Sequence, residues 1–249
     1  MRPEQRVVLD RSAGPSERWL AAVALGGQGR YAAARAVLRP LRRCPDPVVR
    51  SLAASTEGSL WRQLGWHRLA GIHDGRALLE LGGSGSGHLD AQADALIGLA
   101  ADSIGANRLE RGLTLLSRCA LLLDGSDGAE RPRIRMQWVH AEIALAQGRC
   151  TDALQHAEHA AALSRSYPSV RHAVKSDLLV AAAQMASGRS AEAARDVRSI
   201  TSRADVHGLL PLAWASSMLG VALGDEASSG ARDRYCATIR QRGGVFRSE

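Results

Sequence analysis

Aromatic residues are scarce in this sequence, whose 249 positions include one Phe, three Tyr and five Trp. A hydrophobic core must therefore come mainly from Ala and Leu, which favour helices, whereas the aromatic residues that strands favour are few. Hydrophobic residues still make up 45% of the chain, which is too high a share for intrinsic disorder. The composition predicts an all-α protein with a sizeable buried core.

Lysine is almost absent, since Lys175 is the single lysine among 32 cationic residues. Arginine supplies the remainder, and an Arg-, Ala- and Gly-rich composition is typical of GC-rich bacterial coding sequences. The formal net charge of +7 is concentrated at the two ends: residues 1–50 hold ten Arg against four acids, and residues 230–249 hold five Arg against two. We predict a basic N-terminal arm over 1–15 and a basic C-terminal tail over 242–249, which either contact an anionic partner or only aid solubility.

Paired cysteines, long apolar runs and a leader-like N-terminus are also missing. The four cysteines are far apart in sequence: Cys44, Cys119, Cys150 and Cys236. This spacing predicts reduced, buried thiols and no disulfide framework. The longest apolar stretch, around 178–186, is interrupted by Gln184 and falls short of the roughly 20 residues that span a bilayer. We therefore expect a cytoplasmic protein with no signal peptide and no membrane insertion.

Internal repetition is the most informative feature of the sequence. Six residues that tolerate a positive φ follow helix-like segments at intervals of 36–42 residues, namely Gly29, Gly65, Asn107, Gly148, Gly188 and Gly224. Such residues are typical of the position just after a helix ends. A small residue recurs five positions later in the first five units, at Ala34, Ala70, Gly112, Ala153 and Ala193. We predict that these turn residues join two closely packed helices.

Each unit is thus interpreted as a helical hairpin, with a first helix A and a second helix B. The predicted A and B helices are 16–28 and 31–43, 47–64 and 67–81, 88–105 and 108–123, 130–147 and 150–166, 169–187 and 190–203, and 208–223 and 228–241. The six units span about 16–45, 46–82, 88–124, 130–167, 168–204 and 208–241. The Gly/Ser stretch 82–87 and the segment 124–128 are predicted linkers between units.

Three tryptophans support this frame, because Trp19, Trp138 and Trp214 each lie ten residues before a turn residue. Stacked hairpins need a large side chain at a fixed position to fill the space left by small residues on a neighbouring helix. We therefore predict that the three tryptophans occupy equivalent positions on their A helices.

The runs Gly148–Ala153 and Gly188–Ala193 resemble the turn and the first B-helix residues of tetratricopeptide repeats. The spacing here exceeds that family's period of about 34 residues, and its Leu-Gly pair inside helix A is not kept. The resemblance implies a right-handed α-α superhelix of six hairpins, with a concave groove lined by A helices that binds peptides or proteins. The longer units also resemble the helical sensor region of large bacterial transcription activators.

A search for catalytic or metal-binding patterns predicts no enzyme, no cofactor and no metal site. His156 and His159 are one turn apart, yet no acid or cysteine is spaced to complete a metal shell, so a packing or solvated role is predicted. Asp90 and Asp94 lie near a helix start, where acids complement the helix dipole. The remaining histidines considered for this group are His140 and His172.

The candidate binding groove is drawn from the A helices of the fourth and fifth units. Arg135, Trp138 and Glu142 are three and four residues apart on one helix face, and Lys175 and Leu178 are three apart on the next A helix. An aromatic side chain flanked by charges suits a peptide groove. The alternative is that the tryptophan fills the interface between hairpins.

Three functional hypotheses follow. The first is a non-enzymatic scaffold, adaptor or regulator that holds a segment of a protein partner in the concave groove. The second is nucleic-acid binding through the basic ends, carried by Arg39, Arg42, Arg43, Arg240, Arg242 and Arg247. The third is a small-molecule sensor with a pocket between A helices.

Overall fold

The computed structural model describes residues 7–10, 12–82 and 88–247, and this part of the chain forms twelve α-helices and no strand. They make six consecutive hairpins: α1 (Pro15–Gly27) and α2 (Tyr31–Leu41), α3 (Pro47–Arg62) and α4 (His67–Leu81), α5 (Leu89–Gly105) and α6 (Leu109–Leu123), α7 (Glu130–Ala146) and α8 (Cys150–Ser166), α9 (Val170–Ala186) and α10 (Ser190–Val206), α11 (Leu210–Ala222) and α12 (Glu226–Gln241). The predicted all-α fold and its six helix pairs are confirmed.

The six turn residues all have positive φ, from 53° at Asn107 to 86° at Gly65, as the sequence predicts. The amide of the next residue then donates to the carbonyl five residues earlier, for example Arg149 N to Ala144 O at 2.9 Å. This is the Schellman arrangement, which satisfies carbonyls at the end of a helix. The same bond recurs in all six hairpins, so one local rule sets every turn from A to B.

Small residues bring the two helices of a hairpin close together. The four recurrent alanines, Ala34, Ala70, Ala153 and Ala193, are completely buried. At the fifth such position, a Cβ added to Gly112 would lie 2.8 Å from Ile143 Cδ1 and 3.2 Å from the Ala100 carbonyl oxygen. The α5–α6 hairpin therefore has no room for a side chain here.

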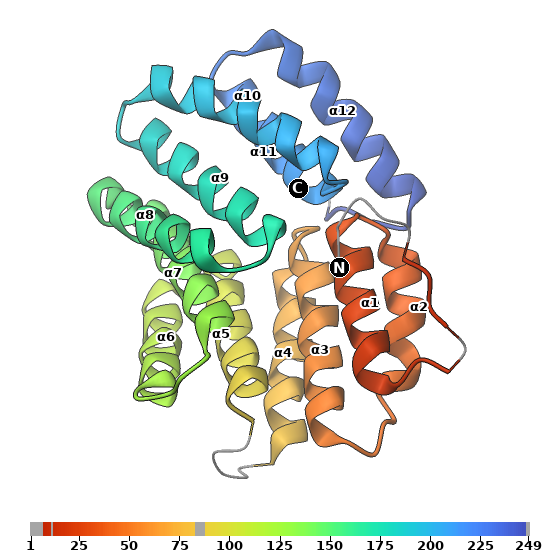
Figure 1. The fold of residues 1–249 in the computed structure, drawn as a ribbon. Coiled ribbons are helices and arrows are strands. Elements are labelled where there is room, and N and C mark those ends of the chain that lie inside the picture. Colours follow the sequence, from red (N-terminus) through yellow and green to blue (C-terminus); the bar gives the residue numbers. More distant parts are fainter. Residues whose placement is uncertain (1–6, 11, 83–87, 248–249) are drawn as a thin grey trace.

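The hairpins stack into a curved array that closes on itself (Figure 1). α1–α4 stand side by side, α5–α8 follow beside them, and α9–α12 return across one end until α12 reaches α1 and α2. Successive A helices (α1, α3, α5, α7, α9 and α11) pack on one another far more extensively than successive B helices do. The A helices therefore line the inner side of the curve, which we call the inner face.

The closure is made by residues 242–247, here named the C-terminal clasp. The Ala32 amide donates to the Arg242 carbonyl at 3.0 Å, and the Arg247 amide donates to the Leu64 carbonyl at 2.9 Å. Trp66 Nε1 donates to the Val245 carbonyl at 2.7 Å. These bonds join the last segment of the described chain to the first two hairpins. Residues 242–247, predicted to be part of a basic C-terminal tail, therefore pack on the first two hairpins, while 248–249 and the arm positions 1–6 and 11 lie outside the described residues.

The same junction has a hydrophobic component. Ile239, Leu210, Trp214 and Phe246 pack in one cluster with core residues of α1, α2 and α3. Leu210 Cδ2 is 2.9 Å from the position that a Cβ on Gly29 would take. The last hairpin thus packs apolar side chains on the first, but less extensively than neighbouring hairpins pack on each other.

The three tryptophans hold equivalent positions, each eight residues before the last residue of its A helix. Trp19 Nε1 donates to Thr56 Oγ1 on α3 at 2.9 Å, and Trp138 Nε1 donates to Ser176 Oγ on α9 at 2.8 Å. In both cases the partner hydroxyl belongs to the next A helix. Trp214, on the last A helix, instead packs on Phe246 of the clasp with ring centroids 4.7 Å apart.

The four cysteines are free thiols, but only Cys119 is buried, whereas Cys44, Cys150 and Cys236 are partly exposed. The segment 124–128 forms the predicted connection between α6 and α7, with positive φ at Gly125 and Gly128. In the part of the chain that the structure covers, no helix combines the length and the apolar character needed to cross a bilayer.

Candidate functional site on the inner face

Three of the five predicted groove residues lie on the inner face, and two lie in the core. The side chains of Arg135, Glu142 and Lys175 are 20%, 31% and 25% exposed. Lys175 Nζ donates to Glu142 Oε1 at 2.7 Å, which joins α7 to α9. Trp138 and Leu178 are only 6% and 7% exposed, and each packs in a hydrophobic cluster with its own and a neighbouring hairpin. The three charged residues, and not the two apolar ones, are open to a partner.

Trp138 is held between α7 and α9 by stacking and by a hydrogen bond. Its ring lies on the His172 ring with centroids 5.1 Å apart, and the accepting Ser176 hydroxyl pairs in turn with Ser164 Oγ at 2.8 Å. Burial and the nearby Arg171 guanidinium lower the pKa of His172 to about 2. His172 is therefore neutral at physiological pH, and this interface is mainly apolar, with one paired set of hydroxyls and one ring nitrogen, His172 Nε2, that is unpaired among the described residues.

Asp94 forms a buried ionic contact with two arginines on the inner face. It is 4% exposed and accepts from Arg131 Nη1 at 2.7 Å and from Arg135. Asp90, whose side chain is 57% exposed, lies 3.4 Å from Arg131 Nη2. The sequence-based role of both acids as helix-dipole partners is wrong for Asp94, because it faces α7 and ties that helix to α5.

A second buried ionic cluster joins α3, α4 and α5, and sequence reasoning missed it. Arg62 Nε donates to Asp102 Oδ1 at 2.7 Å, and the same guanidinium pairs with Asp74. The Asp74 carboxylate occupies space left by Gly58 on α3 and Gly98 on α5. Burial outweighs the attraction of Arg62 and raises the pKa of Asp74 to about 7. In the sequence, the signal for this cluster was the presence of Gly58 and Gly98 inside helices.

Arg171, in the first turn of α9, was also missed. Its Cδ lies 3.5 Å from the position that a Cβ on Gly27 would take, so its stem packs against the end of α1. Burial and repulsion from Arg135 lower its pKa to about 10. Among the described residues, no acid lies within ion-pairing distance of this guanidinium.

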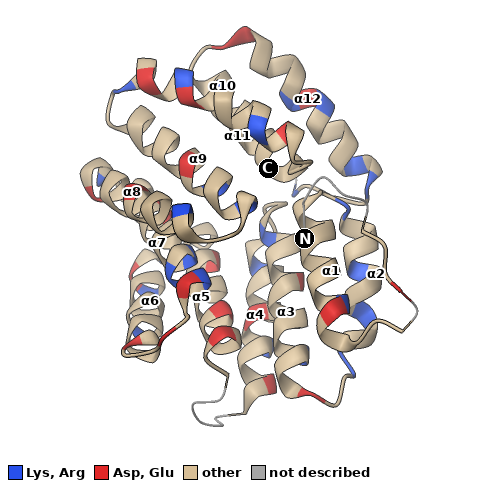
Figure 2. Ribbon diagram, viewed as in Figure 1, with Lys and Arg blue, Asp and Glu red and all other residues tan. Residues whose placement is uncertain are grey.

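The predicted basic contacts lie at the two ends of α2. Arg39 in the last turn of α2 and Arg42 and Arg43 just after it are exposed, with Arg42 Nη2 at 3.5 Å from Glu57 Oε2. The clasp places the other set near the N-terminal end of α2: Arg240 and Arg247 are exposed, and Arg242 donates to the Gln28 carbonyl at 2.8 Å. Figure 2 shows cationic residues along α2 and at the adjacent end of α12.

The histidines do not form the pair that the sequence offered. His156 stacks on His140, with ring centroids 4.7 Å apart, and its Nδ1 lies 2.7 Å from Gln137 Oε1, while His159 is exposed. Burial lowers the pKa of His140 to about 4. No group of three or more His, Cys, Asp or Glu in the described ranges could hold a metal ion.

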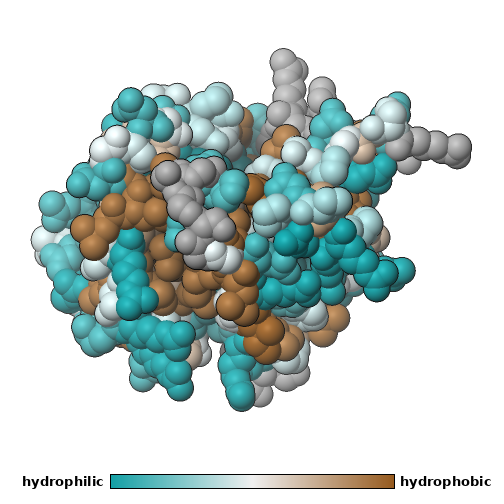
Figure 3. Space-filling model, turned by 90° about the horizontal axis from the view of Figure 1, so that it is seen from below, coloured by the Kyte–Doolittle hydropathy of each residue, from teal (hydrophilic) through white to brown (hydrophobic). Residues whose placement is uncertain are grey.

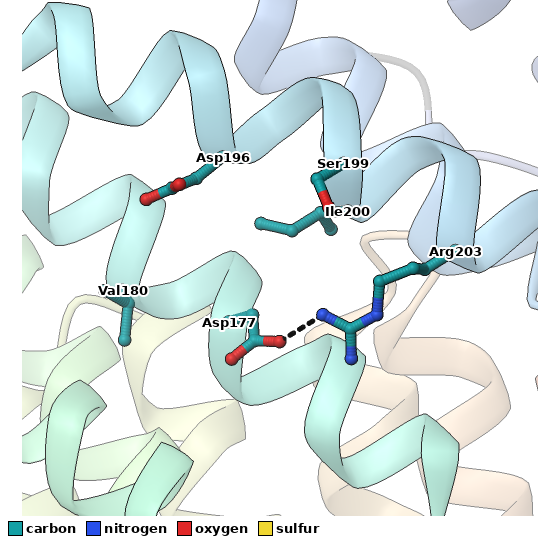
Figure 4. Close-up of a pocket in the computed structure, with 6 residues that line it drawn as sticks. All are labelled: Asp177, Val180, Asp196, Ser199, Ile200 and Arg203. Atoms are coloured by element: carbon teal, nitrogen blue, oxygen red, sulfur yellow. Dashed lines mark hydrogen bonds and ion pairs between the residues drawn. The ribbon is translucent and has the colours of Figure 1, made fainter.

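A shallow, open depression of about 200 Å³ lies between α9 and α10 (Figure 4). Ile200 and Val180 line it together with Asp177 and Asp196. Asp177 Oδ2 is already neutralised by Arg203 Nη1 at 2.5 Å. The depression therefore offers little free charge to a ligand.

Apolar side chains also gather at one end of the array, on the face seen from below (Figure 3). Ile72 and Leu79 on α4 are 67% and 81% exposed, and Leu121 on α6 is 78% exposed. α4 and α6 both pack against α5, so these side chains belong to the outer side of the array.

Comparison of the chain with protein-family models gives no match, and comparison with curated proteins gives none either.

Proposed function

We propose that this protein is a non-enzymatic interaction scaffold that binds a segment of a partner protein along the inner face. The observation that carries the proposal is the set of charged side chains on the A helices α3, α7 and α9. Arg62, Arg131, Arg135, Glu142 and Lys175 are between 16% and 31% exposed. Curved helical-hairpin arrays offer such extended inner surfaces to peptides, and the resemblance to tetratricopeptide repeats supports the same function.

The pairing of these charges favours a binding role. Each guanidinium or ammonium is held in place by an acid on a neighbouring helix, as in the 2.7 Å contact between Lys175 and Glu142. Side chains fixed in this way lose little conformational entropy when a partner binds. They present both donors and acceptors to the backbone and polar side chains of an extended segment.

Lys175 makes the proposal directly testable, because it is the single lysine of the sequence. Apart from a terminal amine, an amine-reactive crosslinker attaches to this protein only at that side chain on the inner face. We expect crosslinking in cells, followed by mass spectrometry, to join Lys175 to one partner segment. The control Lys175→Arg should abolish the crosslink and retain partner binding. A partner that co-purifies with the protein but is never crosslinked at Lys175 would overturn the proposal.

A charge exchange separates binding from folding. Lys175→Glu places two acids together, whereas the double variant Glu142→Lys with Lys175→Glu restores the ion pair with reversed polarity. We expect the double variant to fold with the wild-type melting temperature and to lose the partner. Retained binding by the double variant would contradict an inner-face site.

A second candidate, the binding of nucleic acid, is favoured by exposed arginines at both ends of α2: one set lies at its C-terminal end, and α12 and the clasp bring another set to its N-terminal end. Arg39, Arg43, Arg240 and Arg247 are exposed there. Binding of this kind is mainly electrostatic and falls steeply with salt concentration. Gel-shift assays from low to physiological salt should show that the wild type binds nucleic acid and that the double variant Arg39→Ala with Arg43→Ala binds it more weakly. The absence of a shift at low salt would exclude nucleic-acid binding.

A further inference from the structure

Within the described residues, one cation of the inner face, Arg171, lacks the acidic partner that the other cations have. Arg62, Arg131, Arg135 and Lys175 each have a carboxylate oxygen within 3.0 Å. Arg171, half-buried on the same face, has no acid at ion-pairing distance in the described part of the chain. Removing a charge from water without a counter-charge is costly, and such groups are usually paired.

The surroundings of Arg171 are electropositive and include a second unpaired polar atom. Arg135 on α7 repels its charge, and both guanidiniums act on His172, together with Arg131. One carboxylate, Asp94, is shared between Arg131 and Arg135. His172 is 8% exposed, and its Nε2 is buried without a hydrogen-bond partner. Three guanidiniums, those of Arg131, Arg135 and Arg171, therefore face two acids, Asp90 and Asp94, in the region between α1, α7 and α9.

We infer that Arg171 and Arg135 form an oxyanion site on the inner face, between α1, α7 and α9, that receives an acidic side chain of the bound segment. A guanidinium presents a planar pair of donors that fits a carboxylate or a phosphate in a bidentate manner. The site's position at the junction of α9 with α1 places it where the array closes. The inference that the occupant is an acidic side chain rests on the proposed function. The inference that an oxyanion binds here does not depend on it.

The free protein gives the first test. Arg171→Met keeps a side chain of similar length against Gly27 and removes the unpaired charge. Its melting temperature in chloride buffer should equal or exceed that of the wild type, as should that of the control Arg111→Met, which changes an exposed arginine of α6. A lower melting temperature for Arg171→Met alone would assign Arg171 a structural role at the end of α1 and overturn the site.

The second test uses inorganic phosphate in place of chloride at constant ionic strength. We expect the melting temperature of the wild type and of Arg111→Met to rise with phosphate concentration, and that of Arg171→Met to stay constant. An equal rise in all three proteins would show binding to surface arginines only and would overturn the site.

The third test identifies the occupant with a fluorescently labelled hexaglutamate peptide. Arg171→Met should weaken peptide binding about tenfold, and Arg111→Met should leave it unchanged. Phosphate stabilisation without peptide binding would overturn the acidic segment as the occupant and retain the oxyanion site. In that case the crosslinking through Lys175 decides the proposed function separately.

Discussion

Trp138 offers the sharpest test of how the hairpins are held together. The side chain is 6% exposed, stacks on His172 and donates to Ser176, so Trp138→Ala removes a large ring from the contact between α7 and α9. Truncation of a buried Trp costs about 3–5 kcal/mol. The accepting Ser176 hydroxyl still pairs with Ser164, so the substitution leaves no orphaned polar group. For a chain of this size, the loss corresponds to a fall of about 10 °C in melting temperature.

Two further variants make the measurement specific. Trp138→Phe keeps an aromatic ring on His172 and loses the indole hydrogen bond, which predicts a cost of about 1–2 kcal/mol. Trp19→Ala removes the equivalent but partly exposed side chain and should cost less than Trp138→Ala. Urea unfolding followed by circular dichroism gives all three free energies. If Trp138→Ala lowered the free energy of unfolding by less than about 1 kcal/mol, Trp138 would not be a core residue. Its assignment to the binding groove would then hold instead.

Three other predictions address the turns, the pH dependence and the clasp. Gly148 has a φ of 70° and no atom within 4 Å of a built Cβ, so Gly148→Ala should cost about 1–2 kcal/mol through backbone strain alone, measured by urea unfolding. The pKa of His172 is about 2 in the folded protein and about 6.5 when unfolded, so stability should fall below pH 6.5, by about 2 kcal/mol from pH 7 to pH 5. His172→Phe should flatten that dependence in urea titrations at the two pH values, and an unchanged slope would contradict a buried neutral ring. Phe246→Ala removes the clasp ring from Trp214 and should increase amide hydrogen exchange in α1, α2 and α12, with α5–α8 unaffected.

Local structure was predictable from the sequence because it depends on short-range rules. The first A helix was placed at 16–28 and runs from Pro15 to Gly27, and the fourth was placed at 130–147 and runs from Glu130 to Ala146. A positive φ needs Gly or Asn, and a close helix crossing needs a small residue, so each hairpin carries its own signals. The same rules located Gly29, Gly148 and Gly188 correctly.

The inner-face chemistry was predictable only in part. Arg135, Glu142 and Lys175 were found because helical spacing places charges on one face. Arg171 and the pair of Asp74 with Arg62 were missed, because their environment depends on which distant helices meet. The Arg242 carbonyl accepts from Ala32, 210 positions earlier in the chain, and no periodic pattern encodes such a contact.

Closure fixes the number of hairpins in this protein. An open array has two exposed ends, and a further repeat stacks on either of them with the same geometry as the existing ones. Here Leu210 sits against Gly29 and Phe246 packs with the core of the first hairpins, so each end of the array serves as the other's cap. A seventh hairpin would have no surface to stack on unless this junction opened. The number of hairpins is therefore fixed by the closure. Adding or removing one hairpin would break the contact between the first and the last, and would not simply lengthen or shorten the array.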